Sequence, residues 1–385
     1  MKKGILALLL VFALLVSGCS QSSNVPGSEN SASNQQQTDT KTSDNNSSNT
    51  ASTGGEAVTE TSELFSNRDF EVGYDESTSA IIQLQGDNAV CSSNAVNISG
   101  STVTITDEGT YILSGTLKDG MIVVDAEKTD KLQLVLNNAS IHSETSAPIY
   151  ILKADKVFIT LAASSVNTLS NGGTFTAIDE NNIDAVIFSK DDLTLNGSGR
   201  LEITSPAGHG IVSTDELTLT GGTYQINSAS HGLAGKDNVI IANAEINITS
   251  GKDGIHAENT DDATLGFIYI QSGAFNISSE GDGIAASGRI QIDDGAFSIV
   301  SGGGSANAEM KTSDFRGGFM GGGRMGGPGN SFNGGIPADG TATANTQEDS
   351  ISSKGLKATG NLTVSGGSYA IDASDDAVHS NTSMT

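Results

Sequence analysis

The sequence predicts an all-β protein whose main part is a parallel β-helix, and three observations lead to this fold class. Short alternating apolar runs recur about every 22 residues, from LQLVL at Leu132 to LTVSGG at Leu362. Gly, Asn, Asp and Ser separate these runs, as they do at the corners between strands. The chain has 47 Gly, no Trp and no helical stretch of consequence. Because a unit of three short strands cannot cover its own inner face, we expect the units to stack around one continuous core.

Residues 1–19 are typical of a lipoprotein signal peptide. Two lysines precede an apolar run that is too short to be a convincing membrane span. The run ends in Val16-Ser17-Gly18-Cys19, which resembles a bacterial lipobox, whose cysteine becomes the lipidated first residue. We therefore expect an exported protein, lipid-anchored through Cys19 to the outer face of the bacterial cytoplasmic membrane at the cell surface. The alternative is an ordinary signal peptide in which Cys19 is incidental.

Residues 20–60 are expected to be a disordered tether. They are rich in Ser, Asn, Gln, Thr and Gly and carry almost no large apolar side chain, so they cannot bury enough surface to order themselves. With Cys19 lipidated, Cys91 has no partner for an intrachain disulfide.

The charge of the chain excludes some partners. A formal net charge of -26 repels nucleic acid and anionic lipid and attracts cations. We expect contact with the membrane only through the N-terminal lipid, and a monomer.

Residues 61–385 are expected to form the β-helix. In one unit the apolar pairs Leu217/Leu219 and Tyr224/Ile226 have strand spacing, and Leu233 follows after a turn. A leucine-rich repeat would have a similar period, but its L-x-x-L-x-L-x-x-N pattern is absent. One position in successive units is predicted to form an inward column, because each residue lies two before an inward Ile; the column is Leu201, Tyr224, Ile246, Phe275, Phe297 and Tyr369.

Two further segments are assigned from composition and from the place where the chain stops. Residues 302–350 are glycine-rich and predict a loop inserted at one corner. The chain stops where a new strand should begin, so we expect a fragment of a longer protein with more coils and a cap.

A charged corner recurs before one of the apolar strands, as in SGKDGIHAEN at 250–259 and EGDGIAASG at 280–288. Adjacent coils lie about 4.8 Å apart, and two carboxylates at that distance repel by roughly 3 to 4 kcal/mol at an effective dielectric near 20. Something must offset this repulsion. The corner column is predicted to read Asp184, His209, His231, Asp253, Asp282, Lys354 and Asp376.

Calcium is the cation that we expect at the acidic corners. Asp253 and Asp282 occupy adjacent coils and are joined by further acids, among them Glu258, and the pair Asp375-Asp376 repeats the pattern. Hard carboxylate oxygens with loop carbonyls suit six to eight ligands around Ca²⁺. A second column of corner acids, which includes Asp215 and Asp237, has lysines beside it and is interpreted mainly as turn chemistry.

The histidines do not predict zinc. His209 and His231 are neighbours in the corner column without a third soft ligand. His256 and His379 lie three residues after a corner Asp and point outward, so we interpret both as solvated or ligand-contacting. Lys252, beside Asp253, is a further candidate for ligand contact.

A linked series of segments resembles a known family. The segments AVIFSKDDLTLNGSGRLEI, HGLAGKDNVIIANAEINITSGKDGIHAEN and DDAVHSN, with EGTYILSGTLKDG before them, resemble the bacterial carbohydrate-binding β-helix lipoproteins that bind cellulose and polygalacturonate. The likeness runs from about residue 80 to the end.

The resemblance implies a right-handed parallel β-helix, calcium at acidic corners and affinity for acidic plant polysaccharide without established hydrolysis. Onto this chain it carries Asp253, Asp282, Asp375 and Asp376 as metal ligands, and also Asp237 and Glu258. Lys354 replaces an acid in the corner column, which puts a calcium site on its coil in doubt.

We therefore expect calcium-dependent binding of acidic polysaccharide such as polygalacturonate or pectin, with cellulose as a further ligand, and no catalytic residue. Bare carboxylates would repel a polyuronate, and a shared cation or local basic groups would remove that repulsion. One alternative is a calcium-dependent polysaccharide lyase with Lys252, Lys236 or Arg289 as base. The other is a non-catalytic adhesin or spacer.

Overall fold

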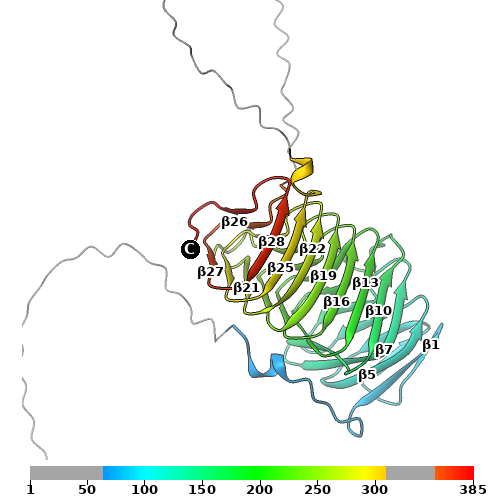
Figure 1. The fold of residues 1–385 in the computed structure, drawn as a ribbon. Coiled ribbons are helices and arrows are strands. Elements are labelled where there is room, and N and C mark those ends of the chain that lie inside the picture. The colour runs from blue at the N-terminus through cyan, green and yellow to red at the C-terminus, as the bar shows by residue number, and fades with distance from the viewer. Residues whose placement is uncertain (1–63, 309–351) are drawn as a thin grey trace, which may run out of the picture. The chain divides into compact units, whose positions relative to one another are not determined.

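The computed structural model describes residues 64–308 and 352–385, and these residues wind into a parallel β-helix. Figure 1 shows strands of successive coils side by side from β10 to β28. The predicted fold class is confirmed. Within the described ranges, helical structure is limited to two 3₁₀ turns, η2 (Asn67–Phe70) and η3 (Ser305–Asn307). No helix in those ranges has the length and hydropathy needed to cross a membrane.

Each full coil contributes one strand to each of three faces, here called A, B and C. Face A consists of β9 (Lys156–Leu161), β12 (Asp192–Gly197), β15 (Glu216–Leu219), β18 (Asn238–Ile241), β21 (Phe267–Ile270), β24 (Ile290–Ile292) and β27 (Leu362–Val364). Face B consists of β10 (Val166–Asn171), β13 (Arg200–Ser205), β16 (Thr223–Ser228), β19 (Ala244–Ser250), β22 (Gly273–Ser279), β25 (Ala296–Ser301) and β28 (Ser368–Ala373).

Face C is an 11-stranded sheet, and faces A and B belong to one 18-stranded sheet. The regular strands of face C are β6 (Met121–Asp125), β8 (Ile149–Lys153), β11 (Ala185–Ser189), β14 (His209–Ser213), β17 (Leu233–Gly235), β20 (Ile255–Ala257), β23 (Ile284–Ala286), β26 (Leu356–Ala358) and β29 (Val378–Ser380).

The first coils are less regular. The long strands β5 (Gly109–Leu117) and β7 (Lys131–Ser143) pair in parallel with a register shift. Two antiparallel pairings begin the stack: β1 (Ala80–Gly86) with β2 (Ala89–Val90), and β3 (Val96–Ser99) with β4 (Thr102–Ile105).

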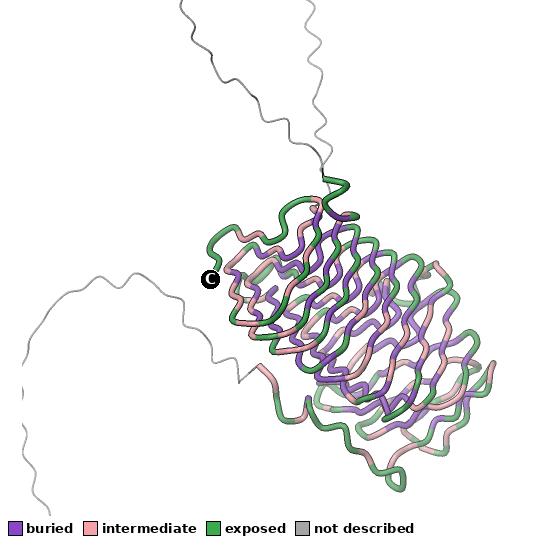
Figure 2. The backbone as a smooth tube through the Cα atoms, in the orientation of Figure 1, coloured by how far each residue is buried: buried purple, intermediate pink, exposed green. Residues whose placement is uncertain are grey.

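The inward column of face B is confirmed. The register pairs Leu201, Tyr224, Ile246, Phe275, Phe297 and Tyr369 in that order. All but Tyr369 are buried, and Figure 2 shows burial alternating along these strands. The Phe297 ring lies between two others, with ring centroids 4.6 Å from Phe275 and 4.7 Å from Tyr369. Core packing therefore explains the aromatic column.

Insertions lie at corners and leave the register intact. The segment between β10 and β11 and the segment between β20 and β21 lengthen two coils, yet the flanking strands stay in parallel register. Of the predicted 302–350 insertion, the structure describes 302–308. The rest of it, the signal peptide with Cys19 and the 20–60 tether lie outside the described residues. One corner is displaced from the prediction, because Ala185, not Asp184, is the register partner of His209.

Residues 64–74, here called the strap, were not predicted as a separate element. The strap crosses the outer side of face A. The Asp69 carboxylate is buried and accepts a 2.6 Å hydrogen bond from Thr194, with Lys156 Nζ 3.1 Å away. Phe65 packs near Tyr269, with ring centroids 5.9 Å apart, and Tyr74 packs on Ile112, Val135 and Ala162. The strap therefore contacts coils from β21 back to β5.

Replacing Phe297 by Ala is expected to lower the free energy of unfolding by about 3 to 5 kcal/mol, because it leaves a cavity between two stacked rings. The measurement is the denaturant midpoint of the wild type and the variant. Ser298→Ala, on the exposed side of the same strand, is the control and should change stability by no more than about 0.5 kcal/mol. Equal effects of the two substitutions would contradict the inward assignment.

Candidate functional site

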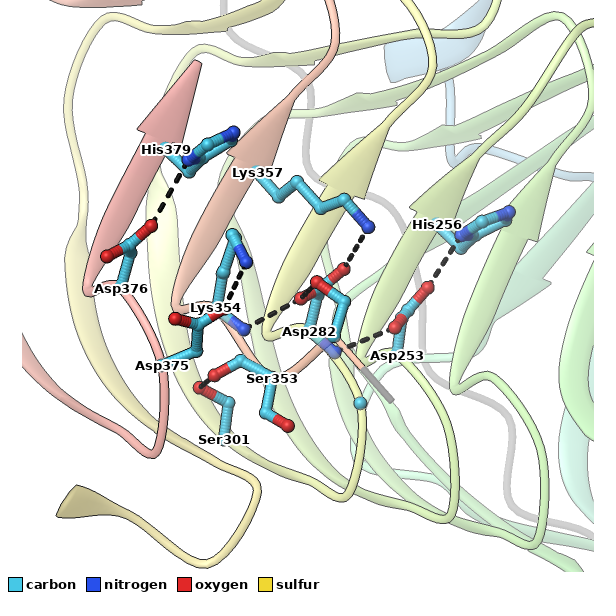
Figure 3. A network of polar contacts seen from close by, with 12 residues as sticks. Asp253, His256, Asp282, Ser301, Ser353, Lys354, Lys357, Asp375, Asp376 and His379 are labelled. Carbon is cyan, nitrogen blue, oxygen red and sulfur yellow. Dashed lines mark hydrogen bonds and ion pairs between the residues drawn. The ribbon is translucent and has the colours of Figure 1, made fainter. Parts of the chain in front are cut away.

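The predicted corner column is present on face C. Backbone hydrogen bonds link His209, His231, Asp253, Asp282, Lys354 and Asp376 in successive coils: for example, Gly232 N–H donates to the Asp253 carbonyl and Gly254 N–H to the Asp282 carbonyl. Asp253 and Asp282 are therefore neighbours, as expected from the repeat. Figure 3 shows the C-terminal part of this column, from Asp253 to Asp376, where corner side chains meet side chains from the adjacent strands.

Close packing explains the glycine that follows most of these corner residues. A Cβ atom built at Gly254 would lie 2.4 Å from Ile277 Cγ2 and 2.6 Å from the Gly283 carbonyl oxygen. A Cβ at Gly283 would meet Ile299 Cγ2 at 2.4 Å in the same way. Because these contacts are far inside van der Waals distance, the corner accepts glycine where another coil lies against it. Close packing alone therefore accounts for the glycine in the recurring Asp-Gly-Ile junction, without any need for a bound ligand.

The Asp282 carboxylate is fully occupied by protein donors. Its side chain is 2% exposed. Oδ1 accepts hydrogen bonds from Ser352 Oγ and from the Lys354 N–H, each at 2.7 Å, and Oδ2 lies 2.9 Å from Lys357 Nζ (Figure 3). The ammonium of Lys357 therefore supplies the positive charge that the sequence assigned to a metal ion.

The Asp253 carboxylate is held by imidazoles and by backbone. Oδ1 accepts the Asp282 N–H at 2.7 Å, and Oδ2 lies 2.8 Å from His256 Nδ1 and 3.5 Å from His231 Nδ1. Burial opposes ionisation, but the hydrogen bond to His256 and the two nearby imidazoles outweigh it and lower the pKa of Asp253.

These surroundings do not fit calcium at the corners of Asp253 and Asp282. Calcium takes six to eight oxygen ligands, whereas a cation here would have to displace Lys357 or accept imidazole nitrogens. The other corner acids also have partners. Asp375 pairs with Lys354, Asp376 Oδ2 lies 3.2 Å from His379 Nδ1, and Glu258 Oε2 lies 3.3 Å from His256 Nε2.

An oxygen-rich elbow lies at the other acidic column. The carboxyls of Asp215 and Asp237, from adjacent coils, share a hydrogen bond. Burial, this hydrogen bond and the neighbouring Asp192 raise the pKa of Asp215 to about 7. Asp237 Oδ1 also accepts a 2.7 Å hydrogen bond from Asn259. Lys236, which precedes Asp237 in the sequence, pairs with Asp261 at 2.9 Å.

Three histidines stack along face C. The ring centroids of His209 and His231 are 5.0 Å apart, and those of His231 and His256 are 4.2 Å apart. Burial lowers the pKa of His209 to about 4, and burial with the neighbouring His256 lowers that of His231 to about 3. Burial also opposes protonation of His256, but its hydrogen bonds to Asp253 and Glu258 outweigh burial and raise its pKa. Of the three stacked imidazoles, His256 is therefore the one whose pKa is raised.

The stacked histidines line a groove of about 630 Å³ on the outer side of face C. Its walls combine amides, carboxylates, two lysines and the apolar surfaces of Phe188 and Val212. The polar lining residues are Glu180, Asn181, Asn182, Asp184, Lys190, Ser213, Thr214, Lys236 and Glu258, besides the three histidines. A second, smaller groove of about 460 Å³ lies on face B and is lined mainly by Ala, Ser and Asn, together with Phe275, Phe297 and Tyr369.

Lys190 and Lys252 give this part of face C local positive charge. Lys190 lines the larger groove, and Lys252 is close enough to lower the pKa of His209 and to act on Asp184. Among the residues that the structure describes, neither ammonium has a carboxylate within ion-pair distance. The sequence indicated Lys252 as a candidate for ligand contact but not Lys190. Acids lie near Lys190 in the sequence, and no sequence pattern showed that they pair with other residues.

The sequence also missed the meeting of His231 and His256. They lie in adjacent outward columns, since the register partner of His256 is Ala234. The small side chain of Ala234 lets the His256 ring lean over the previous coil. Aligning the equivalent positions of successive coils does not reveal this contact. It becomes visible only when two neighbouring positions are compared, and the signal is a small Ala in the coil next to a large His. His379, by contrast, contacts Asp376 of its own coil and has no histidine beneath it in the preceding coil, where Lys354 occupies the corner.

Known proteins similar to this chain are carbohydrate-binding and lyase-like. The family model described as carbohydrate-binding domain-containing protein matches residues 99–385. A protein of that description from Acetivibrio thermocellus is 37% identical over 142 residues, which cover 35% of this chain and 50% of that protein. The chain thus spans about half the length of this curated relative. A solved structure of the polysaccharide lyase-like protein from C. thermocellum, a gadolinium derivative, has 34% sequence identity and a TM-score of 0.55, covering 58% of this chain and 92% of that chain.

Nuclear magnetic resonance of the imidazoles, with chelator present, is expected to show His256 titrating above its ordinary pKa of 6.5 while His231 and His209 stay neutral until about pH 3 and 4. By linkage, the His256 contribution to stability is complete below pH 6.5 and declines as pH rises through the raised pKa. The two buried neutral histidines destabilise the fold as pH falls below 6.5. Three titrations near 6.5 would contradict the stacked arrangement.

Proposed function

Since the chain belongs to the family of carbohydrate-binding domain-containing proteins, we propose that the groove on face C binds polysaccharide. The observation that carries this proposal is the groove itself, about 630 Å³ of concave surface lined by amides, hydroxyls, charged groups and stacked imidazoles. Such a mixture of apolar walls with a few placed polar groups is typical of ligand sites. The lyase-like solved structure, with 34% sequence identity, supports the same class of ligand.

The proposed ligand is an acidic polysaccharide of the polyuronate class, such as polygalacturonate or pectin. Lys190 and Lys252 have no carboxylate partner among the described residues. Burial opposes protonation of His256, but its hydrogen bonds to Asp253 and Glu258 outweigh burial and raise its pKa. The two ammoniums offer positive charge to sugar carboxylates in a chain whose net charge is otherwise strongly negative. Local basic groups thereby remove the repulsion that the overall charge would cause.

Calcium dependence remains part of the proposal, but at a different place. The Asp215–Asp237 elbow brings two carboxyls into contact with oxygen neighbours, and a cation between them would replace the proton that they share. Of the metal ligands predicted from the sequence, Asp237 is the one with this environment. The proposed calcium site is therefore still at acidic corners of adjacent coils, but at Asp215 and Asp237. It does not include Asp253, Asp282, Asp375 or Asp376.

We propose that binding occurs without catalysis. A lyase needs a free base beside the uronate carbon. Lys236 is paired with Asp261, and the Arg289 guanidinium lies over the Phe267 ring at 4.1 Å. Lys252 is the base that keeps the lyase alternative open, and the lyase-like relative favours its examination. Incubation with polygalacturonate, followed by ultraviolet absorbance of unsaturated products, separates the two functions.

The proposed setting is the bacterial cell surface, with export by residues 1–19 and anchoring through Cys19. In this setting the protein would hold the cell against plant polysaccharide. A pure adhesin or spacer role would leave the groove without a ligand, so retention on a polysaccharide matrix distinguishes the two.

Lys190→Gln and Lys252→Gln are each expected to weaken retention on polygalacturonate by about three- to tenfold, because Lys190 lines the groove and Lys252 is close enough to act on the lining residue His209. The measurement is the dissociation constant at fixed salt. Lys118→Gln is the control, since this exposed lysine does not line the groove. Equal losses in all three variants would point to net charge alone and would contradict the groove as the site.

Calcium is expected to raise the melting temperature of the mature chain, and chelator should reverse the rise. Asp237→Asn should abolish most of this effect, whereas Asp376→Asn, at an exposed corner, should keep it. Because calcium competes with the proton held near pH 7 by Asp215, the effect should grow as pH rises through that value. Loss in Asp376→Asn alone would return the site to the corner column.

A further inference from the structure

Three possible ligand atoms lie close together at the wall of the groove. One nitrogen each of His231 and His256 and one oxygen of Asp253 lie within 4.8 Å of one another. The Asp253 oxygen is 2.8 Å from His256 Nδ1 and 3.5 Å from His231 Nδ1. The three side chains come from two adjacent coils, so the register of face C places them together.

The donor set is two imidazole nitrogens and one carboxylate oxygen. Calcium and magnesium prefer oxygen, whereas imidazole suits zinc, nickel and copper. We propose that His231, Asp253 and His256 form a binding site for a divalent cation of this imidazole-preferring class, with Zn²⁺ as its representative. The same corner that does not fit calcium thus fits a different metal.

A second set of contacts orients the proposed ligands. His256 Nε2 lies 3.3 Å from Glu258 Oε2, so a carboxylate accepts the proton of the nitrogen that does not bind the metal. The free oxygen of Asp253 accepts the Asp282 N–H at 2.7 Å. Carboxylate–histidine–metal arrangements of this kind fix the tautomer and the ring orientation in metal sites. Glu258 therefore supports the site from outside it.

Metal binding requires a modest rearrangement. The two rings are nearly parallel, with planes inclined by 21°, so each must turn toward the other to aim its nitrogen at a shared ion. The second side-chain torsion of histidine is broad, and such a turn costs little. His231 Nδ1 accepts a 3.1 Å hydrogen bond from the Asp253 N–H, which coordination would replace. The three side chains are only 14 to 21% exposed, which limits competition from solvent.

The chain contains a natural comparison. His379 and Asp376 repeat the same Asp-x-x-His spacing, with Nδ1 and Oδ2 3.2 Å apart. In the preceding coil, however, Lys354 stands where His231 stands relative to His256. An ammonium cannot ligate a cation and repels it. The spacing alone is therefore insufficient, and the second imidazole makes the difference.

A metal at this place would leave one coordination position open toward the groove. Three protein ligands satisfy three of the four positions that zinc usually fills. A carboxylate or hydroxyl of a sugar could complete the set. This extension rests on the proposed function, whereas metal binding itself does not, and the two are measured separately.

Calorimetric titration of the full chain with Zn²⁺ and, separately, with Ca²⁺ tests the site. We expect Zn²⁺ binding near one equivalent that weakens by at least about tenfold in His231→Gln and in His256→Gln, since loss of even an outer partner costs that much. His379→Gln is the matched control and should bind Zn²⁺ as the wild type does. Unchanged zinc affinity in the first two variants, or an equal loss in the third, would overturn the proposal.

A second measurement does not depend on the variants folding. Electron paramagnetic resonance of the wild-type Cu²⁺ complex reports how many nitrogens bind the metal. Two imidazole nitrogens are expected, and one or none would overturn the site. Retention on polygalacturonate with and without Zn²⁺ then tests the extension: unchanged retention rejects only the sugar contact and leaves the titration result standing.

Discussion

In-register stacking of identical positions is the constraint on which the rest of this structure depends. Each residue of a coil lies about 4.8 Å from its counterpart in the next coil, so side chains meet their own kind unless the sequence changes along the column. On the inside this favours uniformity, as in the stack of Phe275, Phe297 and Tyr369. At the corners it forces glycine where another coil presses closest, as at Gly254. On the outside, the same stacking places like charges next to one another. Each outer column must therefore offset the electrostatic repulsion between them.

Face C resolves the conflict by mixing residue types and by leaning side chains across coils. Lys357 reaches the carboxylate of Asp282 in the preceding coil, and His256 lies over His231 while holding Asp253. At the Asp215–Asp237 elbow the conflict is not removed by a salt bridge among the described residues, and burial with the neighbouring carboxyl raises the pKa of Asp215 to about 7. The groove adds a third case, in which the ammoniums of Lys190 and Lys252 have no carboxylate within ion-pair distance among the described residues. We therefore expect ligand binding at places where charged side chains of the outer columns lack an oppositely charged partner.

The sequence predicts the columns well and their cross-contacts poorly. Apolar pairs at strand spacing locate the coils, the corners and the inward stack, because period and burial are tied together. An inserted segment before β11 displaced one corner by one residue, so that Asp184 was placed where Ala185 lies. The meeting of His256 with His231, the capture of Asp282 by Lys357 and the docking of the strap depend on three-dimensional neighbours outside a column. Periodicity carries no information about them, and for this reason the metal and charge assignments changed more than the fold did.

The strap also has a mechanical consequence. The chain enters the solenoid beside β21 and runs back along face A to β5 before the first coil begins, with Asp69 held by Thr194 and Lys156 on the way. A pull transmitted through the chain to residue 64 would reach these lateral contacts before it reached β1. Hydrogen bonds and ring contacts in several coils would then bear the load together, in shear. The first strands of the stack would not be pulled off one after another.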